Sequence, residues 1–253
     1  MGAMDNAAFR STVDSVAREI IATEHRAAGS FIRTPLLYPS GSTVVVQIKE
    51  AAGRYFVTDM GFGYQEAEMM GASFIYSRHA GAVADSAGIS FDSQAFFIAE
   101  APREQLAGAA VTVANCSQEA TALAAFKLAE RKAADDAERL YDRLVSVFSA
   151  RDVVKDAEVY GASNTKWPVA ALVKANGDRR PTVFEPVRRH HSSVAHASMK
   201  FHDLALLERP PNRIAVVHEK RDFGTLLGVL TQAASVIDDT VSDEALLRLA
   251  KVA

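Results

Sequence analysis

The sequence predicts an α+β protein in which two strand-containing regions are joined by a helical connection. Alternating apolar residues mark strands in both regions, as in "STVVVQIKEA" (42–51) and "RPTVFEPV" (180–187). Between them, "TALAAFKLAERKAADDAERLYDRLVSVF" (121–148) contains no Gly or Pro, which favours a long helix. We therefore expect a small α+β domain at 5–102, a helical connection at 103–149 and an α/β domain with a mixed sheet at 150–253.

The composition is that of an ordinary globular protein. Of 253 residues, 49% are hydrophobic and 23% are charged, and the formal net charge is −3. This balance gives no sign of a surface built for polyanions. Cys116 is the single cysteine, so neither an internal disulfide nor a cysteine-based zinc site can form. We expect a cytoplasmic protein without a membrane span.

The N-terminal domain is predicted to follow the order α-β-β-α-α-β. Its first element is an amphipathic helix over 6–26, with one face formed by Phe9, Val13, Val16, Ile20 and Thr23. Its sheet contains a β-hairpin that turns at Ala52-Gly53.

A compact signature follows the hairpin in "FVTDMGFGYQEAEMMGASF". Asp59 is placed to accept backbone N–H groups in a turn that Gly61 and Gly63 permit. Capping of the next helix accounts for Asp59 without any catalytic role.

The helical connection is amphipathic. We predict that one stripe is buried, formed by Leu123, Phe126, Leu140, Leu144 and Val147. The opposite face is solvated. If these apolar positions outnumber what one core can bury, helices in 103–149 make a homodimer contact.

The C-terminal domain is predicted to follow the order β-β-β-α-β-α, with a last short helix at 242–250. The strands are expected at 152–161, 167–175, 180–187 and 212–219. A helix capped by Ser192 or Ser193 runs to about Glu208, and "FGTLLGVLTQAASVI" (223–237) is a second helix.

Three histidines surround the start of the helix capped by Ser192 or Ser193, in "EPVRRHHSSVAH" (185–196). Steps of 100° per residue bury Val194, Ala197, Phe201, Leu204 and Ala205. They place His196, Lys200 and Asp203 in water. A metal site using His191 and His196, or His190 in place of His191, is the alternative, but the spacing lacks the i, i+4 pair of a zinc helix. We favour surface histidines and no metal.

A metal-dependent nuclease is the alternative to a non-enzymatic protein. A helix, three strands, a helix and a strand is the element order of the restriction-endonuclease core, which holds Mg²⁺ with an acid on its second strand and Glu-x-Lys on its third. The third strand here offers Glu185, without a lysine two residues later, and the second strand has no acid. Asp178, Glu158 and Asp156 are the possible substitutes. We therefore predict no catalytic residues and no cofactor, with Glu185, Asp178, Glu158 and Mg²⁺ as the alternative.

Basic residues of the same domain form a candidate nucleic-acid contact. Arginine suits phosphate oxygens, and the candidates are Arg179, Arg180, Arg188, Arg189 and Lys200. No aromatic residues interleave with them, and a basic patch without a ligand is an equal alternative. Phosphate-loop, dinucleotide-binding and nucleophile-elbow motifs are absent from the sequence.

The segments "TPLLYPSGSTVVVQIKEAAGRYFVTDMGFGYQEAEMMGAS" and "AGISFDSQAFFIAEAP" resemble the N-terminal domain of a bacterial two-domain family of unknown function. Its pattern is a hairpin ending in Thr-Asp-x-Gly, then a short helix and a Gly-Ile hinge before a strand, and the likeness covers about residues 30–100. The second half is similar to the partner domain, a divergent restriction-endonuclease-like core. The resemblance implies a bacterial, phage or mobile-element origin and assigns no catalytic residue.

Two functions follow as hypotheses. The first is a non-enzymatic binding or regulatory protein that acts on a protein or nucleic-acid partner, because no complete catalytic constellation is visible. The second is a nuclease or phosphodiesterase with an atypical carboxylate site. We favour the first.

Overall fold

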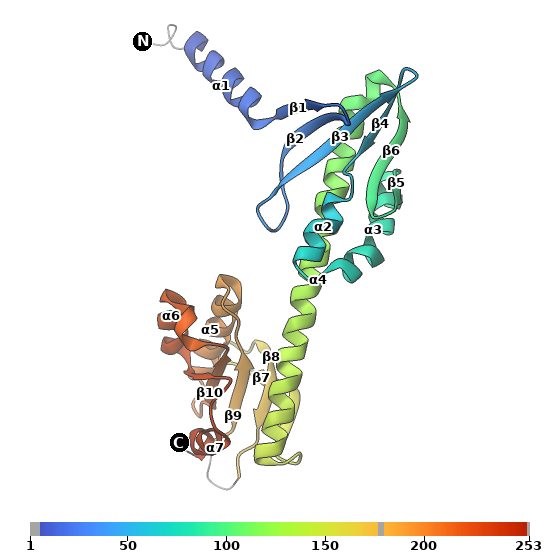
Figure 1. Cartoon of the computed structure of the whole chain (residues 1–253). Helices are drawn as coiled ribbons and strands as arrows, with labels where there is room; N and C mark the ends of the chain where they lie inside the picture. Colours follow the sequence, from blue (N-terminus) through green and yellow to red (C-terminus); the bar gives the residue numbers. More distant parts are fainter. Residues whose placement is uncertain (1–5, 177–179, 252–253) are drawn as a thin grey trace. The chain divides into compact units, whose positions relative to one another are not determined.

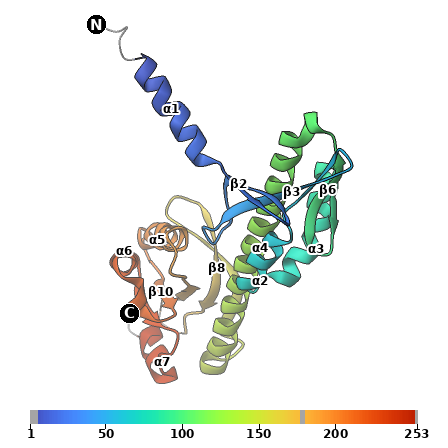
Figure 2. The same cartoon turned by 45° about the horizontal axis from the view of Figure 1, so that its top comes forward.

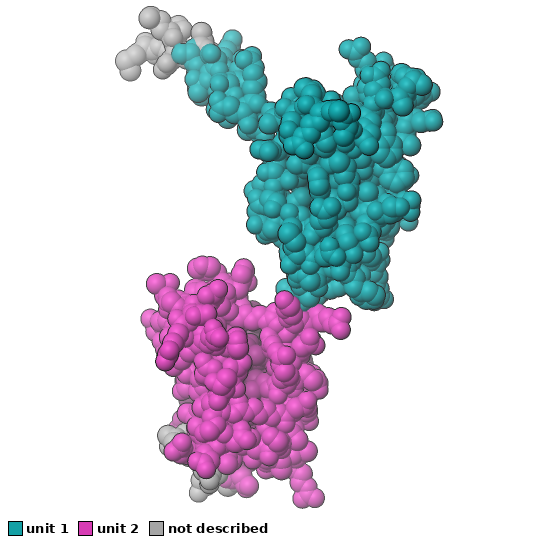
Figure 3. All heavy atoms as spheres, in the orientation of Figure 1, with its two compact units in different colours: residues 1–130 teal, residues 131–253 magenta. Residues whose placement is uncertain are grey.

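The computed structural model describes residues 6–176 and 180–251 and confirms the α+β class. The chain forms two compact units, residues 1–130 and 131–253 (Figure 3). The boundary lies within helix α4 (Leu106–Phe148), which contributes its first part to unit 1 and its second part to unit 2.

Unit 1 is built on an antiparallel sheet with strand order β1-β2-β3-β4-β6-β5 (Figure 1). Its elements before α4 are α1 (Asn6–Ile20), β1 (Ala22–Arg26), β2 (Gly29–Leu37), β3 (Thr43–Ala51), β4 (Arg54–Thr58), α2 (Phe62–Met69), α3 (Ser73–Ala87), β5 (Ser90–Asp92), β6 (Ala95–Ala101) and a 3₁₀ turn (Arg103–Gln105).

The predicted hairpin is confirmed. Strands β3 and β4 pair from Gln47 with Thr58 to Ala51 with Arg54, leaving Ala52-Gly53 as a two-residue turn. Both turn residues have positive φ, 51° and 75°, as a turn that matches the right-handed strand twist requires. The core of unit 1 packs this sheet against α2, α3 and the first part of α4. Val46 and Val57 of the sheet share one buried cluster with Tyr76 of α3 and Val113 of α4.

The prediction of one helix over 6–26 is wrong at its C-terminal end. Helix α1 ends at Ile20, and Ala22–Arg26 forms strand β1, which pairs antiparallel with β2 from Ala22–Arg33 to Arg26–Gly29. The backbone hydrogen bonds available from β2 override the helical periodicity of residues 22–26. Strands β2 and β5 were not part of the predicted element order either.

Unit 2 has the predicted β-β-β-α-β-α order and one further strand. Its elements after α4 are β7 (Val153–Tyr160), β8 (Lys166–Val173), β9 (Thr182–Pro186), α5 (His191–Ala205), β10 (Asn212–Val217), a 3₁₀ turn (Lys220–Phe223), α6 (Thr225–Ala233), β11 (Ser235–Asp238) and α7 (Asp243–Lys251). Residues 235–237, predicted to be helical, lie in β11, which pairs parallel with β10.

The sheet of unit 2 is mixed, as predicted, and its strand order is β11-β10-β9-β8-β7. Strand β8 runs antiparallel to β7 and β9, whereas β9, β10 and β11 are mutually parallel. Helices α5 and α6 cover one face, since Phe201 and Leu230 share a core cluster with Val183. Helices α4 and α7 cover the other, since Leu140, Leu144 and Leu246 pack with Phe184.

The predicted buried stripe of α4 is confirmed in part. Leu140 and Leu144 are buried, whereas Phe126 is 58% exposed and was wrongly placed in the stripe. In unit 1 the buried side of α4 is formed mainly by small residues such as Ala114 and Ala120. Among the described residues, no helix combines the length and apolarity that crossing a bilayer requires.

Candidate functional site

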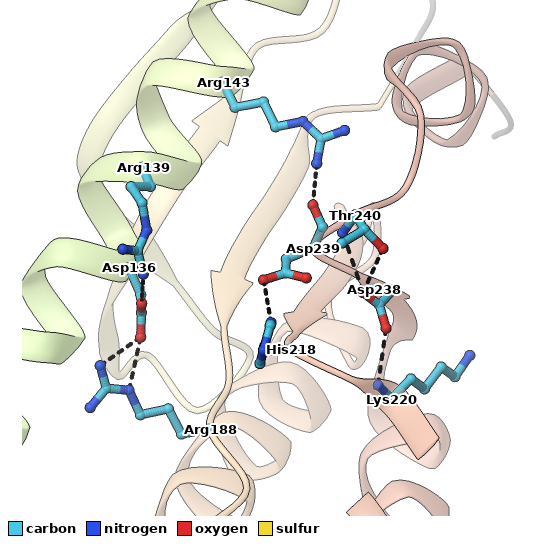
Figure 4. A network of polar contacts seen from close by, with 9 residues as sticks. All are labelled: Asp136, Arg139, Arg143, Arg188, His218, Lys220, Asp238, Asp239 and Thr240. Atoms are coloured by element: carbon cyan, nitrogen blue, oxygen red, sulfur yellow. Dashed lines mark hydrogen bonds and ion pairs between the residues drawn. The ribbon is translucent and has the colours of Figure 1, made fainter. Parts of the chain in front are cut away.

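A charged cleft lies at the carboxyl ends of the three parallel strands of unit 2. Its volume is about 890 Å³, and α4 forms one of its walls. The residues that follow parallel strands lie at the same end of the sheet. Arg188 after β9, His218 after β10 and Asp239 after β11 therefore all lie at the carboxyl ends of these strands (Figure 4). In open α/β sheets, ligands bind at this edge.

The cleft has an apolar floor and a charged rim. Buried side chains of Leu140, Val187, Val216, Val217 and Phe223 line its floor. The charged residues that line it are Lys132, Asp135, Asp136, Arg139, Arg143, Arg188, Arg189, His218, Glu219, Asp222 and Asp239. Five are acidic and five are Lys or Arg, so the formal charge of the lining is zero when His218 is neutral.

Two arginines share one carboxylate on the wall formed by α4. Arg188 donates from Nε (2.9 Å) and Nη2 (2.6 Å) to Oδ2 of Asp136. Arg139, one turn along α4 from Asp136, donates to the other carboxylate oxygen. Asp136 therefore joins α4 to the end of β9, and this side of the rim keeps an excess of positive charge.

Arg143 binds the segment that follows β11. Its guanidinium donates to the carbonyl oxygens of Asp239 and Val241 and to Oδ1 of Asp243, the last at 3.0 Å from Nη2. The arginine thus satisfies backbone acceptors between β11 and α7 and holds Asp239 at the cleft.

His218 and Asp239 form an exposed pair on adjacent strand ends. His218 Nδ1 lies 2.9 Å from Asp239 Oδ2, and the hydrogen bond and charge of Asp239 raise the pKa of the imidazole. The next carboxylate, Asp238, accepts from the backbone N–H of Lys220 and from Thr240, which lowers its pKa to about 2. Asp238 is thereby a fixed anion that anchors the turn after β10.

Glu185 and Lys200 pair away from the cleft. Lys200 Nζ lies 2.7 Å from Glu185 Oε1, and the lysine also donates to the carbonyl of Pro168. Its side chain is 2% exposed, so the prediction that Lys200 faces water is wrong. The other Glu185 oxygen accepts the N–H of Ala170 at 3.0 Å. Placed between Val183 and Val187, which pack under α5, Glu185 uses the lysine of that helix as its counter-ion.

The other carboxylates of the alternative catalytic set do not join Glu185. Glu158 pairs with Lys166, and its neighbours Ala157 and Val159 pack toward α5, so Glu158 projects from the opposite face of the sheet. Asp156 interrupts β7 with a φ of 46°. Asp178 lies outside the described residues. Across 6–176 and 180–251, no group of three His, Cys, Asp or Glu side chains is close enough to hold a metal ion.

The five candidate nucleic-acid residues occupy different places. Arg180 precedes β9 and Arg188 follows it, about 26 Å apart along an extended chain. Lys200 is buried, and Arg188 binds Asp136. Arg189 is exposed, with its nearest carboxylate, Asp222, at 3.8 Å. Arg179 lies outside the described residues.

The histidines of the alternative metal set point apart. The N-cap of α5 is His190, not Ser192 or Ser193, and its Nδ1 accepts from the N–H of Ser192. His191 and His196 are both exposed, and five helical steps separate them by about 140°. The His196 ring lies edge-on to Trp167 at 5.8 Å between centroids. The predicted burial of Val194, Ala197, Phe201 and Leu204 is confirmed.

Unit 1 carries a buried polar cluster around Asp59. As predicted, the carboxylate accepts the N–H groups of Gly61 (3.1 Å) and Gly63 (3.4 Å). It also accepts from Phe96 N (2.8 Å) and Ser117 Oγ (2.6 Å), which tie β6 and α4 to the turn. Burial raises the pKa of Asp59 despite these donors. Asp59 is fully buried, and its contacts link four elements, so the cluster serves the fold.

Sequence reasoning missed the cleft. The residues that build it come from α4, from the last residues of β9 and β10, and from the segments that follow β9, β10 and β11. No short motif contains them. The available signal was the position of Arg188, His218 and Asp239 directly after apolar strands, where parallel pairing brings them together.

Comparison with protein-family models, with curated proteins and with solved structures finds no match to this chain. The resemblance to a bacterial two-domain family and to a restriction-endonuclease-like core therefore stays a prediction.

Proposed function

We propose that the chain is a non-enzymatic binding protein whose C-terminal unit takes a polypeptide segment in the charged cleft. The observation that carries the proposal is the combination of an apolar floor with a rim of both charge signs. A bacterial or mobile-element origin, and action in the cytoplasm, belong to the same proposal.

The net charge of the rim differs in sign between its two sides, which meet where Arg189 lies 3.8 Å from Asp222. The side formed by α4 and the end of β9 carries five cations and two carboxylates, and the segments after β10 and β11 carry three carboxylates. Arg139, Arg188 and Arg189 come from α4 and the end of β9, where two of them share the single carboxylate of Asp136. Glu219, Asp222 and Asp239 follow β10 and β11. A ligand with an apolar side chain between an acidic and a basic group matches this arrangement, and peptides supply such groups on one segment.

A nucleic acid fits the cleft less well. Its phosphates would approach Asp135, Asp136, Glu219, Asp222 and Asp239 together with the arginines. The basic residues outside the cleft do not extend its positive side. Arg180 precedes β9 and so lies at the opposite end of the strands, and Lys200 is buried. Polyanion binding needs a continuous positive surface.

The test is a selection against the full-length protein. A random twelve-residue peptide library on phage is selected on the wild type, with counter-selection on an Arg188→Glu, Arg189→Glu double variant. Gel-shift assays with double-stranded DNA, single-stranded DNA and RNA run in parallel over a salt series. We expect peptides that combine an apolar residue with flanking charges and need both arginines. Salt-sensitive nucleic-acid shifts lost in the double variant, or no peptide preferring the wild type, contradict the proposal.

The metal-dependent nuclease is kept as a second candidate because of one observation. Lys200 supplies from α5 the cation that the sequence after Glu185 lacks, so a carboxylate and a lysine do lie side by side. The assay is nucleic-acid cleavage with Mg²⁺ or Mn²⁺ against EDTA, for the wild type and Glu185→Ala. Metal-dependent cleavage that Glu185→Ala abolishes establishes this function and overturns the binding proposal.

A further inference from the structure

A second pocket lies in unit 2, at the end of the sheet opposite to the charged cleft. Its volume is about 380 Å³, within the range of about 300–1,000 Å³ that small-molecule sites occupy. The start of β10, the first residue of β11, the carboxyl end of α6 and one residue of α7 line it. Helices α6 and α7 pack on opposite faces of β10 (Figure 2).

The lining of this pocket is positively charged. Its described residues include two arginines, Arg180 and Arg213, and no aspartate or glutamate, so their formal charge is +2. Thr231, Gln232 and Ser235 add hydroxyl and amide groups that can donate hydrogen bonds. An anion is therefore the charge-complementary ligand for this pocket, in contrast to the cleft, whose lining has a formal charge of zero.

Arg213 is partly removed from water without a counter-ion. Among the residues that the structure describes, three arginines are half-buried, namely Arg143, Arg188 and Arg213. Arg143 pairs with Asp243 and Arg188 with Asp136, whereas no described carboxylate pairs with Arg213. Its desolvation lowers the pKa of the guanidinium. Charges that are taken out of water are normally paired, so this arginine indicates that an anion binds here.

Two backbone carbonyls hold the guanidinium of Arg213 in place. Nε donates to the carbonyl oxygen of Ala233 and Nη1 donates to that of Pro211, each at 3.1 Å. No described residue accepts a hydrogen bond from Nη2, so one N–H of Nη1 and both N–H groups of Nη2 are available to a ligand. The carbonyls fix the side chain without neutralising it, and a planar guanidinium suits two oxygens of one oxyanion.

The charge of the pocket favours a phosphoryl group over a carboxylate. A carboxylate carries one negative charge, whereas a phosphate monoester carries about −1.5 to −2 at neutral pH and has three acceptor oxygens. The carboxyl end of α6 opposes an anion with roughly half a negative charge. Arg213 offsets that charge through its bond to Ala233, the last residue of α6. Two arginines then match the charge of one phosphoryl group.

We propose that this pocket binds the phosphoryl group of a small molecule between Arg180 and Arg213. The group belongs either to free inorganic phosphate or to a small phosphate monoester. Gln232 and Ser235 lie on the lining, where they donate to further phosphate oxygens. The site is separate from the cleft and does not depend on the polypeptide proposed for it.

A nuclear magnetic resonance titration of the full chain with sodium phosphate, at neutral pH and constant ionic strength, tests the site. The backbone N–H signals of Arg213, Gln232 and Ser235 are expected to shift in a saturable way. Arg180→Ala is expected to weaken binding about tenfold, because one of two charge-assisted contacts is lost. Arg151→Ala, at the same end of the sheet but outside the pocket, should keep the wild-type affinity. Absence of saturable shifts, or equal weakening by both variants, overturns the proposal.

Arg213→Lys tests the guanidinium itself. Lysine keeps the charge but not the planar set of donors, so phosphate affinity should fall about tenfold. Wild-type affinity in this variant contradicts the role assigned to Arg213.

Comparison of ligands tests the chemical class. Acetate that binds this pocket as tightly as phosphate overturns the phosphoryl assignment. Tighter binding of glycerol 3-phosphate than of inorganic phosphate supports the site and identifies a monoester as its ligand. Equal affinity for the two also supports the site and identifies free phosphate.

Discussion

Lys200 of α5 and Glu185 of β9 form an ion pair, with 2.7 Å between Nζ and Oε1. The lysine side chain is buried and the glutamate side chain is 19% exposed. The lysine also donates a hydrogen bond to the carbonyl oxygen of Pro168, near the start of β8. One side chain thus connects a helix to two strands. Buried charges are retained where each is paired and hydrogen-bonded, as both are here.

Removing the charge of Lys200 alone is expected to destabilise unit 2 more than removing the charges of Lys200 and Glu185 together. Lys200→Met leaves Glu185 without a counter-ion and should lower the free energy of unfolding of unit 2 by about 3–5 kcal/mol. The double variant Lys200→Met, Glu185→Gln leaves no unpaired charge, so its free energy of unfolding should fall by clearly less. Urea unfolding followed by the fluorescence of Trp167, the single tryptophan, measures both. Equal losses in the two variants contradict a coupled ion pair.

Gly63 is required by packing in unit 1. A Cβ at this position would lie 2.6 Å from Ser117 Oγ and 2.7 Å from Tyr76 Oη. Gly63→Ala should therefore destabilise unit 1 by about 1–3 kcal/mol, which urea unfolding followed by far-ultraviolet circular dichroism measures. Gly81→Ala is the matched control, because nothing lies within 4 Å of its Cβ. The control should be neutral or stabilising, as alanine favours the helix. Equal destabilisation by both changes contradicts the steric argument.

Asp59 links the stability of unit 1 to pH. Burial raises its pKa in the folded state, so the folded protein binds a proton more tightly than the unfolded chain does. The stability that Asp59 contributes is full below the unfolded pKa of about 3.9 and is lost as pH rises through the folded value.

The comparison is between wild type and Asp59→Asn. Their difference in unfolding free energy should move in favour of the wild type as pH falls from 7 toward 4, measured by urea unfolding at each pH. A shift in favour of Asp59→Asn over that range would show that the four donors to the carboxylate outweigh its desolvation.

His218 should titrate above the usual histidine range. Its hydrogen bond and charge interaction with Asp239 favour the imidazolium form. Nuclear magnetic resonance titration of the His218 ring should give a pKa above about 6.5 in the wild type and a lower value in Asp239→Asn. The pair therefore stabilises the fold below the unfolded pKa, and this contribution disappears as pH rises through the folded value. An unchanged pKa in Asp239→Asn contradicts the pairing.

The sequence was most informative where one local pattern decides the structure. Alternation around Ala52-Gly53 predicted the hairpin, and helical periodicity predicted the buried face of α5 at Val194 and Phe201. The two glycines after Asp59 predicted its acceptor role, because backbone donors within four residues satisfy it.

Long-range relationships were beyond the reach of local patterns. Residues 22–26 continue a helical pattern, and only their pairing with β2 makes them a strand. Lys200 lies at the edge of the apolar face of α5, where 100° steps do not decide between water and a buried carboxylate. His218 and Asp239 are 21 residues apart and meet only because β10 and β11 are parallel neighbours.

The cleft as a polypeptide-binding site is tested most directly by charge reversal at Arg189, an exposed residue of its rim. The measurement is the affinity of one selected peptide for the wild type, for Arg189→Glu and for Arg151→Glu. Arg151 is an exposed arginine that precedes β7, at the end of the sheet opposite to the cleft. We expect a loss of about tenfold or more in Arg189→Glu, wild-type affinity in Arg151→Glu, and recovery when an acidic residue of the peptide is replaced by arginine. Equal affinity for all three proteins would contradict the assignment of the cleft.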